Sequence, residues 1–214
     1  MASTDLKKFR KNYTKLTLSK KEVNKNPFLQ FNNWFEDALM NENSEVNAMI
    51  FATVGENNKP SARVVLLKDF DEKGFVFFTN YESKKGKQIS QNNYAAIVFF
   101  WHNIERQVRI EGAISKISND QSDSYFEERP LGNKIGAIVS PQSQVILNSQ
   151  YLEDLKTKIE TKLQNKEIHR PANWGGYCLE PDLFEFWQGR ADRLHDRLQY
   201  RKEDATWIIE RLAP

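Results

Sequence analysis

Residues 48–79 read AMIFATVGENNKPSARVVLLKDFDEKGFVFFT, and this stretch decides the fold class. Three apolar runs, Ala48–Val54, Ala62–Lys68 and Phe75–Thr79, are rich in β-branched, aliphatic and aromatic residues, which favours strands. The connections, 55–60 and 71–74, carry Gly, Asn, Asp and Pro, which are typical of turns. Because connections this short join neighbouring strands in opposite directions, the stretch predicts antiparallel hairpins.

The pattern continues on both sides of this stretch. Phe28, Phe31, Phe35 and Leu39 recur every three or four residues behind the cap signal Asn26-Pro27, which predicts a helix over 27–42. The same reasoning predicts helices over 84–91, 119–128, 131–139 and 151–166, and strands over 94–101, 106–117, 174–180, 184–187, 193–201 and 206–212. Hairpin strands, a helical insertion and further strands together indicate one α+β domain around an antiparallel barrel.

The composition is that of a soluble globular protein. The 214 residues include 31 Lys and Arg against 29 Asp and Glu, a net charge of +2, and 39% are hydrophobic. No apolar run approaches the ~20 residues of a membrane span, and residues 1–10 lack the apolar core of a signal peptide. The single cysteine, Cys178, excludes an internal disulfide and indicates a reducing compartment. We therefore expect a cytoplasmic protein with no membrane partner.

Positive charge is concentrated at the N-terminus. Residues 1–25 hold eight basic and two acidic side chains. A basic arm can bind nucleic acid or another polyanion, but it can equally be a solvated tail. No pattern of stacking aromatic residues accompanies the arm, so we expect no nucleic-acid partner. The predicted organisation is a flexible basic arm over 1–20 and a single domain over 21–214.

Several kinds of chemistry lack their motifs. The nine glycines form no Gly-x-Gly, so the dinucleotide fingerprint is absent, and neither a phosphate-binding P-loop nor a Gly-x-Ser-x-Gly elbow occurs. His102, His169 and His195 are far apart in sequence and Cys178 has no cysteine partner, so we expect no metal site.

Cations beside apolar strands are the strongest remaining signal. In Arg193-Leu-His-Asp-Arg197, the alternation of a strand would place Arg193, His195 and Arg197 on one face. Two guanidinium groups and an imidazole in one row suit a phosphate or a carboxylate. The row can also be a solvated polar face paired with acids such as Asp192 and Asp196, and the pattern alone leaves both interpretations open.

Other cations allow the same interpretation. Arg63 and Lys68 stand at the two ends of an apolar strand. Lys84 and Lys85 open a predicted helix, where backbone amides favour an anion. These positions predict anion sites on a barrel, but they do not name a ligand.

The chain also resembles a known family, the pyridoxamine (pyridoxine) 5′-phosphate oxidases, from about Arg10 to Pro214. The resemblance rests on Arg63-Val-Val-Leu-Leu-Lys68, Phe78-Thr79-Asn80, Glu105-Arg-Gln-Val108, Tyr125-Phe126, Arg129-Pro130, Ile135-Gly136-Ala137, Gln142-Ser143, Trp174-Gly175-Gly176, Phe186-Trp187-Gln188-Gly189, Arg193-Leu-His-Asp-Arg197 and Arg211-Leu-Ala-Pro214. It implies an α+β fold, namely an antiparallel Greek-key split β-barrel (the FMN-binding split barrel) with flanking helices. It also implies a homodimer with FMN at the subunit interface.

The resemblance assigns roles residue by residue. It implies FMN binding by Arg63, Val64, Val65, Leu66, Leu67, Lys68, Phe78, Thr79, Lys84, Lys85, Gln107, Gln142, Ser143, Trp187 and Arg197. It implies substrate binding by Arg10, Lys11, Asn12, Tyr13, Lys68, Tyr125, Arg129, Asn133, Arg193, Leu194 and His195. Arg193 and His195 are the implied catalytic residues, and 10–13 is a segment that can close over the site. Two positions depart from the family, since Asn133 replaces a usual Ser and Lys84 a usual Arg.

The implied reaction is FMN-dependent oxidation of pyridoxamine 5′-phosphate and pyridoxine 5′-phosphate by O2 to pyridoxal 5′-phosphate. It releases H2O2, and ammonia from the amine, in vitamin B6 cofactor synthesis and salvage. Two alternatives are a split-barrel flavin reductase or oxidase with another substrate, and a non-catalytic flavin- or pyridoxal-phosphate-binding protein.

Overall fold

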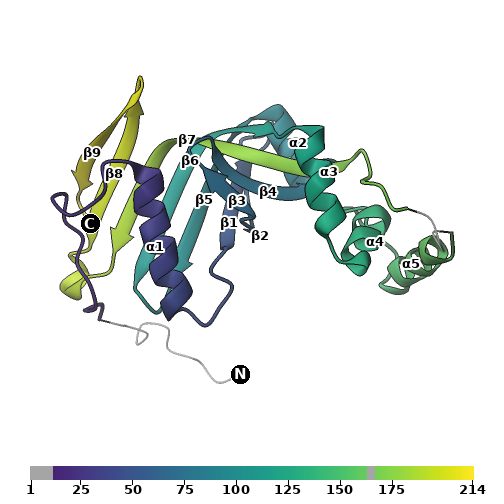
Figure 1. Ribbon diagram of the computed structural model, residues 1–214, viewed down its shortest axis with the longest axis horizontal. Helices are drawn as coiled ribbons and strands as arrows, with labels where there is room; N and C mark the ends of the chain where they lie inside the picture. The colour runs from purple at the N-terminus through teal and green to yellow at the C-terminus, as the bar shows by residue number, and fades with distance from the viewer. Residues whose placement is uncertain (1–11, 163–166) are drawn as a thin grey trace. The chain divides into compact units, whose positions relative to one another are not determined.

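The computed structural model describes residues 12–162 and 167–214, and the chain divides into two compact units (Figure 1). Of the described residues, the first unit takes in 12–48, 98–110 and 182–214, and the second takes in 49–97, 111–162 and 167–181. Strands β5 (Tyr94–Trp101), β6 (Arg106–Lys116) and β7 (Trp174–Gln188) each contribute several residues to both units.

The second unit is built on a sheet whose strands pair in the order β2-β1-β5-β6-β7-β4-β3. Its remaining strands are β1 (Ala48–Val54), β2 (Pro60–Leu66), β3 (Asp69–Asp71) and β4 (Gly74–Asn80). β4 pairs antiparallel with both β3 and β7. The three strands predicted from residues 48–79 are therefore confirmed, with the short β3 as an addition between the second and the third. The hairpin expected between the second and third strands is wrong, because β2 is a neighbour of β1 in the sheet, whereas β4 pairs with β3 and β7.

Aromatic side chains form the core of this unit. The rings of Phe51 and Phe77, from β1 and β4, pack with centroids 4.7 Å apart, and both are fully buried. Burial alternates along β1, as expected for a strand with one face against a core. This core fixes β1, β2 and β4 as a rigid base for the side chains at their ends and outer faces.

Four helices belong to the second unit: α2 (Lys84–Gln91), α3 (Asn119–Glu128), α4 (Leu131–Val139) and α5 (Gln150–Lys162). The Ser83 side chain caps α2 by accepting a hydrogen bond from the Gly86 amide. Ser118 and Gln121 form a capping box at the start of α3. The four predicted helices are confirmed, and the expected end of the last one, at residue 166, lies outside the described residues.

The first unit contains α1 (Pro27–Asn41) and the hairpin of β8 (Asp196–Glu203) and β9 (Thr206–Leu212). Asn26 caps α1 by accepting a hydrogen bond from the Phe28 amide. The apolar face of the helix is aromatic, and its Phe28 and Trp34 rings each lie 5.2 Å from a phenylalanine ring of β7. β7 and β8 pair antiparallel, and this register sets Trp187 opposite Arg197.

Two predictions for the C-terminal strands are wrong. A single continuous strand, β7, takes the place of the two strands expected at 174–180 and 184–187. Pro181 lies within this strand and does not end it. The strand expected at 193–201 begins only at Asp196, because Asp192 (φ 54°) and Arg193 (φ 61°) adopt left-handed backbone conformations within a 3₁₀ turn, Ala191–Arg193. Arg193 therefore does not share a strand face with Arg197.

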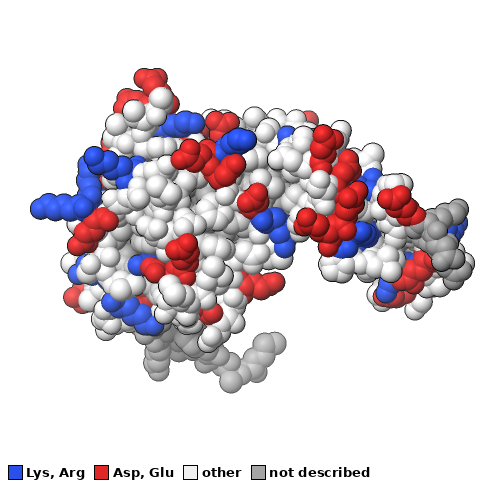
Figure 2. Space-filling view, viewed as in Figure 1, with Lys and Arg blue, Asp and Glu red and all other residues white. Residues whose placement is uncertain are grey.

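The surface carries charges of both signs. Blue and red side chains are intermixed on the face shown in Figure 2. None of the helices in the described part of the chain is long and apolar enough to cross a membrane. The division into an arm over 1–20 and one domain over 21–214 stays a prediction.

Helix α2 approaches the backbone of Tyr81 so closely that Gly86 tolerates no side chain. A Cβ at Gly86 would overlap the Tyr81 carbonyl oxygen, whereas a Cβ at Gly136 in α4 would meet nothing within 4 Å. We expect Gly86→Ala to lower the free energy of unfolding by about 1–3 kcal/mol. Gly136→Ala, the matched control, should raise it by about 0.4–1 kcal/mol. Urea denaturation measures both, and equal stabilisation by the two substitutions would contradict the packing described for α2.

Candidate active site

A cavity of about 870 Å³ in the second unit collects most of the predicted site residues. Its volume is within the range of small-molecule sites, roughly 300–1,000 Å³. The predicted residues that line it are Arg63, Val64, Val65, Leu66, Lys68, Phe78, Thr79, Lys84, Lys85, Tyr125, Arg129, Asn133, Gln142 and Ser143. These residues come from β2, β4, α2, α3, α4 and the chain after α4, so the sheet and the helical insertion together build one site.

Lys85 places a desolvated ammonium group at this cavity. Its Nζ donates hydrogen bonds to Thr79 Oγ1 (3.0 Å), Ser83 Oγ (3.2 Å) and Gln142 Oε1 (2.8 Å). All three acceptors are uncharged. Burial, together with the charge of Arg63, lowers the pKa of Lys85 from its ordinary value to about 8. A buried cation with neutral partners gains stability when an anion binds beside it.

Arg63 has the same kind of surroundings. Its Nη1 donates to the Phe51 carbonyl oxygen (3.0 Å) and to Thr53 Oγ1 (2.7 Å). Its Nη2 lies 3.4 Å from Gln88 Oε1. Burial lowers the pKa of the guanidinium group. Among the described residues, no carboxylate hydrogen-bonds to Arg63 or Lys85, so the cavity holds two partly buried positive charges that are not neutralised.

A third cation is held against an aromatic stack. The rings of Phe78 and Tyr125 are parallel within 14°, with centroids 3.8 Å apart, and Trp174 continues the stack at 5.5 Å from Phe78. The Arg129 guanidinium lies over the Trp174 ring, 4.4 Å from its centroid. Arg129 Nη1 is buried without a hydrogen-bond partner, which in a native protein indicates a missing ligand or solvent group. Burial also lowers the pKa of this guanidinium.

The rim of the cavity is polar and more exposed. Lys68, at the end of β2, and Lys84, at the start of α2, are both exposed lysines. Asn133, in the first turn of α4, and Ser143, with φ 71°, are exposed as well. The rim therefore adds two exposed cations and two neutral hydrogen-bonding groups to the partly buried charges of the cavity.

The remaining predicted residues that the structure describes form a second set, in the first unit. The rings of Tyr13, Trp187 and His195 form a cluster, with Trp187 and His195 centroids 4.6 Å apart and Tyr13 edge-on to both at 5.7 and 5.8 Å. Burial, and then the charge of Arg193, lower the pKa of His195, which favours the neutral imidazole. Leu194 is largely exposed beside it.

Arg197 belongs to the second set and pairs with a buried acid. Its Nε donates to Glu185 Oε1 at 2.7 Å, and Arg109 binds the other oxygen, Glu185 Oε2, at 2.8 Å. The hydrogen bond that Arg197 donates to Glu185 raises the pKa of Arg197. Asp196 is one of the acids that the sequence offered as partners for the row of cations in 193–197. It forms ion pairs with Arg190 and Arg211. Gln107, on β6, is also half-buried, as are Trp187, His195 and Arg197.

The residues that line the cavity, as far as the chain is described, include none of Asn12, Tyr13, Gln107, Trp187, Arg193, Leu194, His195 and Arg197. Leu67 does not line the cavity either, because its side chain is buried. Arg10 and Lys11 lie outside the described residues. The roles assigned to all of these residues stay predictions.

Trp174 is the main site residue to which the sequence analysis gave no role. It lines the cavity and supports both Phe78 and Arg129. The sequence feature that could have indicated a role for Trp174 is the pair Gly175-Gly176, which follows it. In the β4–β7 register these glycines lie opposite Thr79 and Phe78. A Cβ at Gly175 would overlap the Tyr81 hydroxyl group and one at Gly176 would overlap the Ile117 side chain, so the glycines let these side chains pack against β7.

Two family models match this chain. The one described as pyridoxamine 5′-phosphate oxidase matches residues 35–162. The one described as the pyridoxine 5′-phosphate oxidase C-terminal dimerisation region matches residues 174–214. Together they take in the residues that line the cavity and the described residues of the second set other than Asn12 and Tyr13.

Curated relatives agree with these matches. A protein of Acaryochloris marina named pyridoxine/pyridoxamine 5′-phosphate oxidase is 51% identical over 211 residues, which are 99% of this chain and 96% of the relative. One of Gloeothece citriformis with the same name is 53% identical over 206 residues, 96% of each chain.

Solved structures show the fold. PhzG from Burkholderia lata 383, in complex with tetrahydrophenazine-1-carboxylic acid, superposes with a TM-score of 0.86 at 23% identity, covering 95% of this chain and 100% of the other. A pyridoxamine 5′-phosphate oxidase-related, FMN binding protein from Nostoc punctiforme PCC 73102 gives 0.69 at 20% identity, covering 86% and 97%. At these identities the likeness concerns the fold alone, and the predicted split barrel is confirmed. With both family models and relatives above 50% identity, the chain belongs to the pyridoxamine 5′-phosphate oxidase family of oxidoreductases.

Proposed function

We propose that this protein oxidises pyridoxamine 5′-phosphate and pyridoxine 5′-phosphate with O2 to pyridoxal 5′-phosphate, using FMN and releasing H2O2, with ammonia from the amine. The observation that carries the proposal is the cavity with partly buried cations that have only neutral partners, beside a flat aromatic stack. Both proposed ligands pair a planar ring with a phosphate group. The names of relatives that are 51–53% identical over nearly their whole length support the same reaction.

The residues present fit FMN. In this proposal Arg63, Lys84 and Lys85 bind the FMN phosphate, since their positive charge lacks a carboxylate partner within the described chain. The flavin supplies two-electron redox chemistry when it is bound. The side chains or backbone of Val64, Val65, Leu66, Leu67, Lys68, Phe78, Thr79, Gln142 and Ser143 contact its remaining parts, and Gln107, Trp187 and Arg197 complete the site. Lys84 in place of the family's usual Arg keeps the charge but gives up the bidentate fork.

A second phosphate position is proposed for the substrate. Arg129 holds its unpartnered Nη1 ready for a phosphate oxygen, and Tyr125, Lys68 and Asn133 line the same cavity. Asn133 can still donate a hydrogen bond where the family usually has a hydroxyl. Fixing the phosphate orients the substrate ring and so lowers the entropic part of the barrier.

Arg193 and His195 are proposed to orient the reacting carbon of the substrate. The Arg193 guanidinium can stack on the pyridine ring, and neutral His195 can hydrogen-bond a ring substituent. The proposal gives residues 10–13 the role of a cover, and Tyr13 already lies against His195 and Trp187. No nucleophilic side chain is needed in this scheme.

We also propose a homodimer with FMN at the interface between its subunits. Residues 174–214 match a dimerisation region, which supports self-association. The outer faces of β1, β2 and β5 expose Ile50, Val64 and Tyr94 at 45%, 64% and 56%, while the opposite face of β1 is buried. Apolar side chains on both faces of a sheet are stabilised when both faces are shielded from water, and a second copy of the chain would shield the outer face. The single cysteine is compatible with a reducing, cytoplasmic location.

Flavin content and turnover test the proposed function together. The purified protein, loaded with FMN, should absorb near ~450 nm and form an aldehyde and peroxide from pyridoxine 5′-phosphate. Arg193→Leu should reduce turnover while FMN stays bound. A protein that cannot be loaded with FMN would overturn the proposal. Flavin binding without vitamer turnover would favour a reductase of another substrate or a carrier, and loss of FMN in Arg193→Leu would refute the role given to Arg193.

The pKa of Lys85 predicts a pH dependence of FMN affinity. Without FMN the ammonium group deprotonates near pH 8, and a bound phosphate dianion would raise that pKa. Affinity should therefore be full below pH 8 and fall as pH rises above it, by up to about tenfold per unit. FMN titrations between pH 7 and 9.5, where the phosphate is already a dianion, measure this effect. Lys85→Arg, whose charge persists, should abolish the decline, and an equal decline in both proteins would rule out Lys85 as its source.

A further inference from the structure

The loop between β7 and β8 carries Arg193 and His195 in a conformation that its sequence does not favour. Asp192 (φ 54°) and Arg193 (φ 61°) are consecutive non-glycine residues in the left-handed region. Such residues persist only where surrounding contacts determine the backbone, and they occur often at functional sites. The contacts that hold this loop are therefore as important to the site as the side chains it presents.

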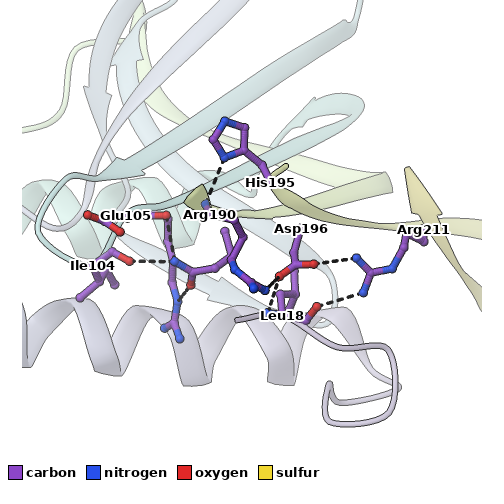
Figure 3. Close-up of polar contacts among 9 residues, drawn as sticks. Leu18, Ile104, Glu105, Arg190, His195, Asp196 and Arg211 are labelled. Atoms are coloured by element: carbon purple, nitrogen blue, oxygen red, sulfur yellow. Dashed lines mark hydrogen bonds and ion pairs between the residues drawn. The ribbon is translucent and has the colours of Figure 1, made fainter. Parts of the chain in front are cut away.

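Arg190 closes the loop by two hydrogen bonds to adjacent residues at its far end (Figure 3). Its backbone amide donates to His195 Nδ1 at 3.1 Å. Its guanidinium Nη1 donates to Asp196 Oδ2 at 2.7 Å. The first bond leaves Nδ1 as an acceptor, so a neutral His195 carries its proton on Nε2.

Asp196 connects this loop to two other segments of the first unit (Figure 3). Its Oδ2 also accepts a hydrogen bond from the Leu18 amide (3.1 Å), and its Oδ1 accepts one from Arg211 Nη1 (2.8 Å). Arg211 Nη2 donates in turn to the Leu18 carbonyl oxygen (3.0 Å). The carboxylate is 14% exposed and ionised, because hydrogen bonds from Arg211, Leu18 and Arg190 outweigh the effect of burial and lower its pKa.

We propose that Asp196 is a positioning residue for His195. By holding the Arg190 side chain, it keeps the Arg190 amide on Nδ1, so that the imidazole presents Nε2–H to the substrate. His195 then acts as a fixed hydrogen-bond donor rather than as a proton acceptor. This inference rests on the proposed function for the identity of the substrate, but the state of the imidazole can be observed without turnover.

The test uses the FMN-loaded protein, with Asp196→Asn and Arg190→Met as the two variants. Glu203→Gln is the matched control, since it removes a charge from the same strand at a side chain that is 58% exposed. Each variant should raise the KM for pyridoxine 5′-phosphate about tenfold, as expected for losing a charged hydrogen bond. The effect on kcat and on FMN affinity should be smaller, and the double variant should be no worse than either single one. Glu203→Gln should match the wild type.

Nitrogen NMR of the imidazoles separates positioning from a general loss of structure. The chain has three histidines, so His195→Gln assigns the signal. The wild type should show a proton on Nε2 only, and both variants should show a mixture of tautomers. A wild-type proton on Nδ1, or an unchanged KM and tautomer in both variants, would overturn the inference. A wild type that fails to oxidise the vitamer would refute the proposed function instead, and the tautomer comparison would still decide the role of Asp196.

Discussion

Positive charge without a carboxylate partner, inside the cavity of the second unit, is the constraint on which the site depends. Within 12–162 and 167–214, Lys85 and Arg63 donate only to neutral oxygens, and burial lowers the pKa of both groups. Such an arrangement is unfavourable for the protein alone and becomes favourable when an anion binds. The aromatic core formed by Phe51 and Phe77 supports the strands of this unit, and so helps to hold these cations in place.

Helix α2 shows how local sequence produces this charge arrangement. Ser83 caps the helix and also accepts a hydrogen bond from Lys85. Gly86 lets the helix approach the Tyr81 backbone, which fixes the direction of its first turn. A cap, a glycine and a lysine at adjacent positions thus place one desolvated ammonium group. Each is an ordinary feature by itself, and their combination supports the phosphate site that we propose.

Regular structure was largely predictable from local signals, and irregular structure was not. The bounds of α2 and β9 agree with their predictions because caps and turns mark them directly. The prediction of a strand from Arg193 onward was wrong. The alternation of polar and apolar residues cannot reveal two left-handed backbone conformations, which here lie in a turn whose ends are joined by the hydrogen bond between Arg190 and Asp196. For the site, charge alone predicted anion binding at Arg63 and Lys85, whereas their assignment to FMN came from the family resemblance. Trp174 had no assigned role because an aromatic residue beside two glycines also resembles core.

The most direct measurement compares FMN with riboflavin, which has the same ring system and no phosphate, in titrations of the flavin-free protein at pH 7. If the partly buried cations bind the phosphate, FMN should bind at least about 100-fold more tightly, as expected when several charge-assisted hydrogen bonds are lost together. Arg63→Gln should remove most of that difference and leave riboflavin affinity unchanged. Equal dissociation constants for the two flavins would contradict the account, because the cavity's charge would then have no part in holding the cofactor.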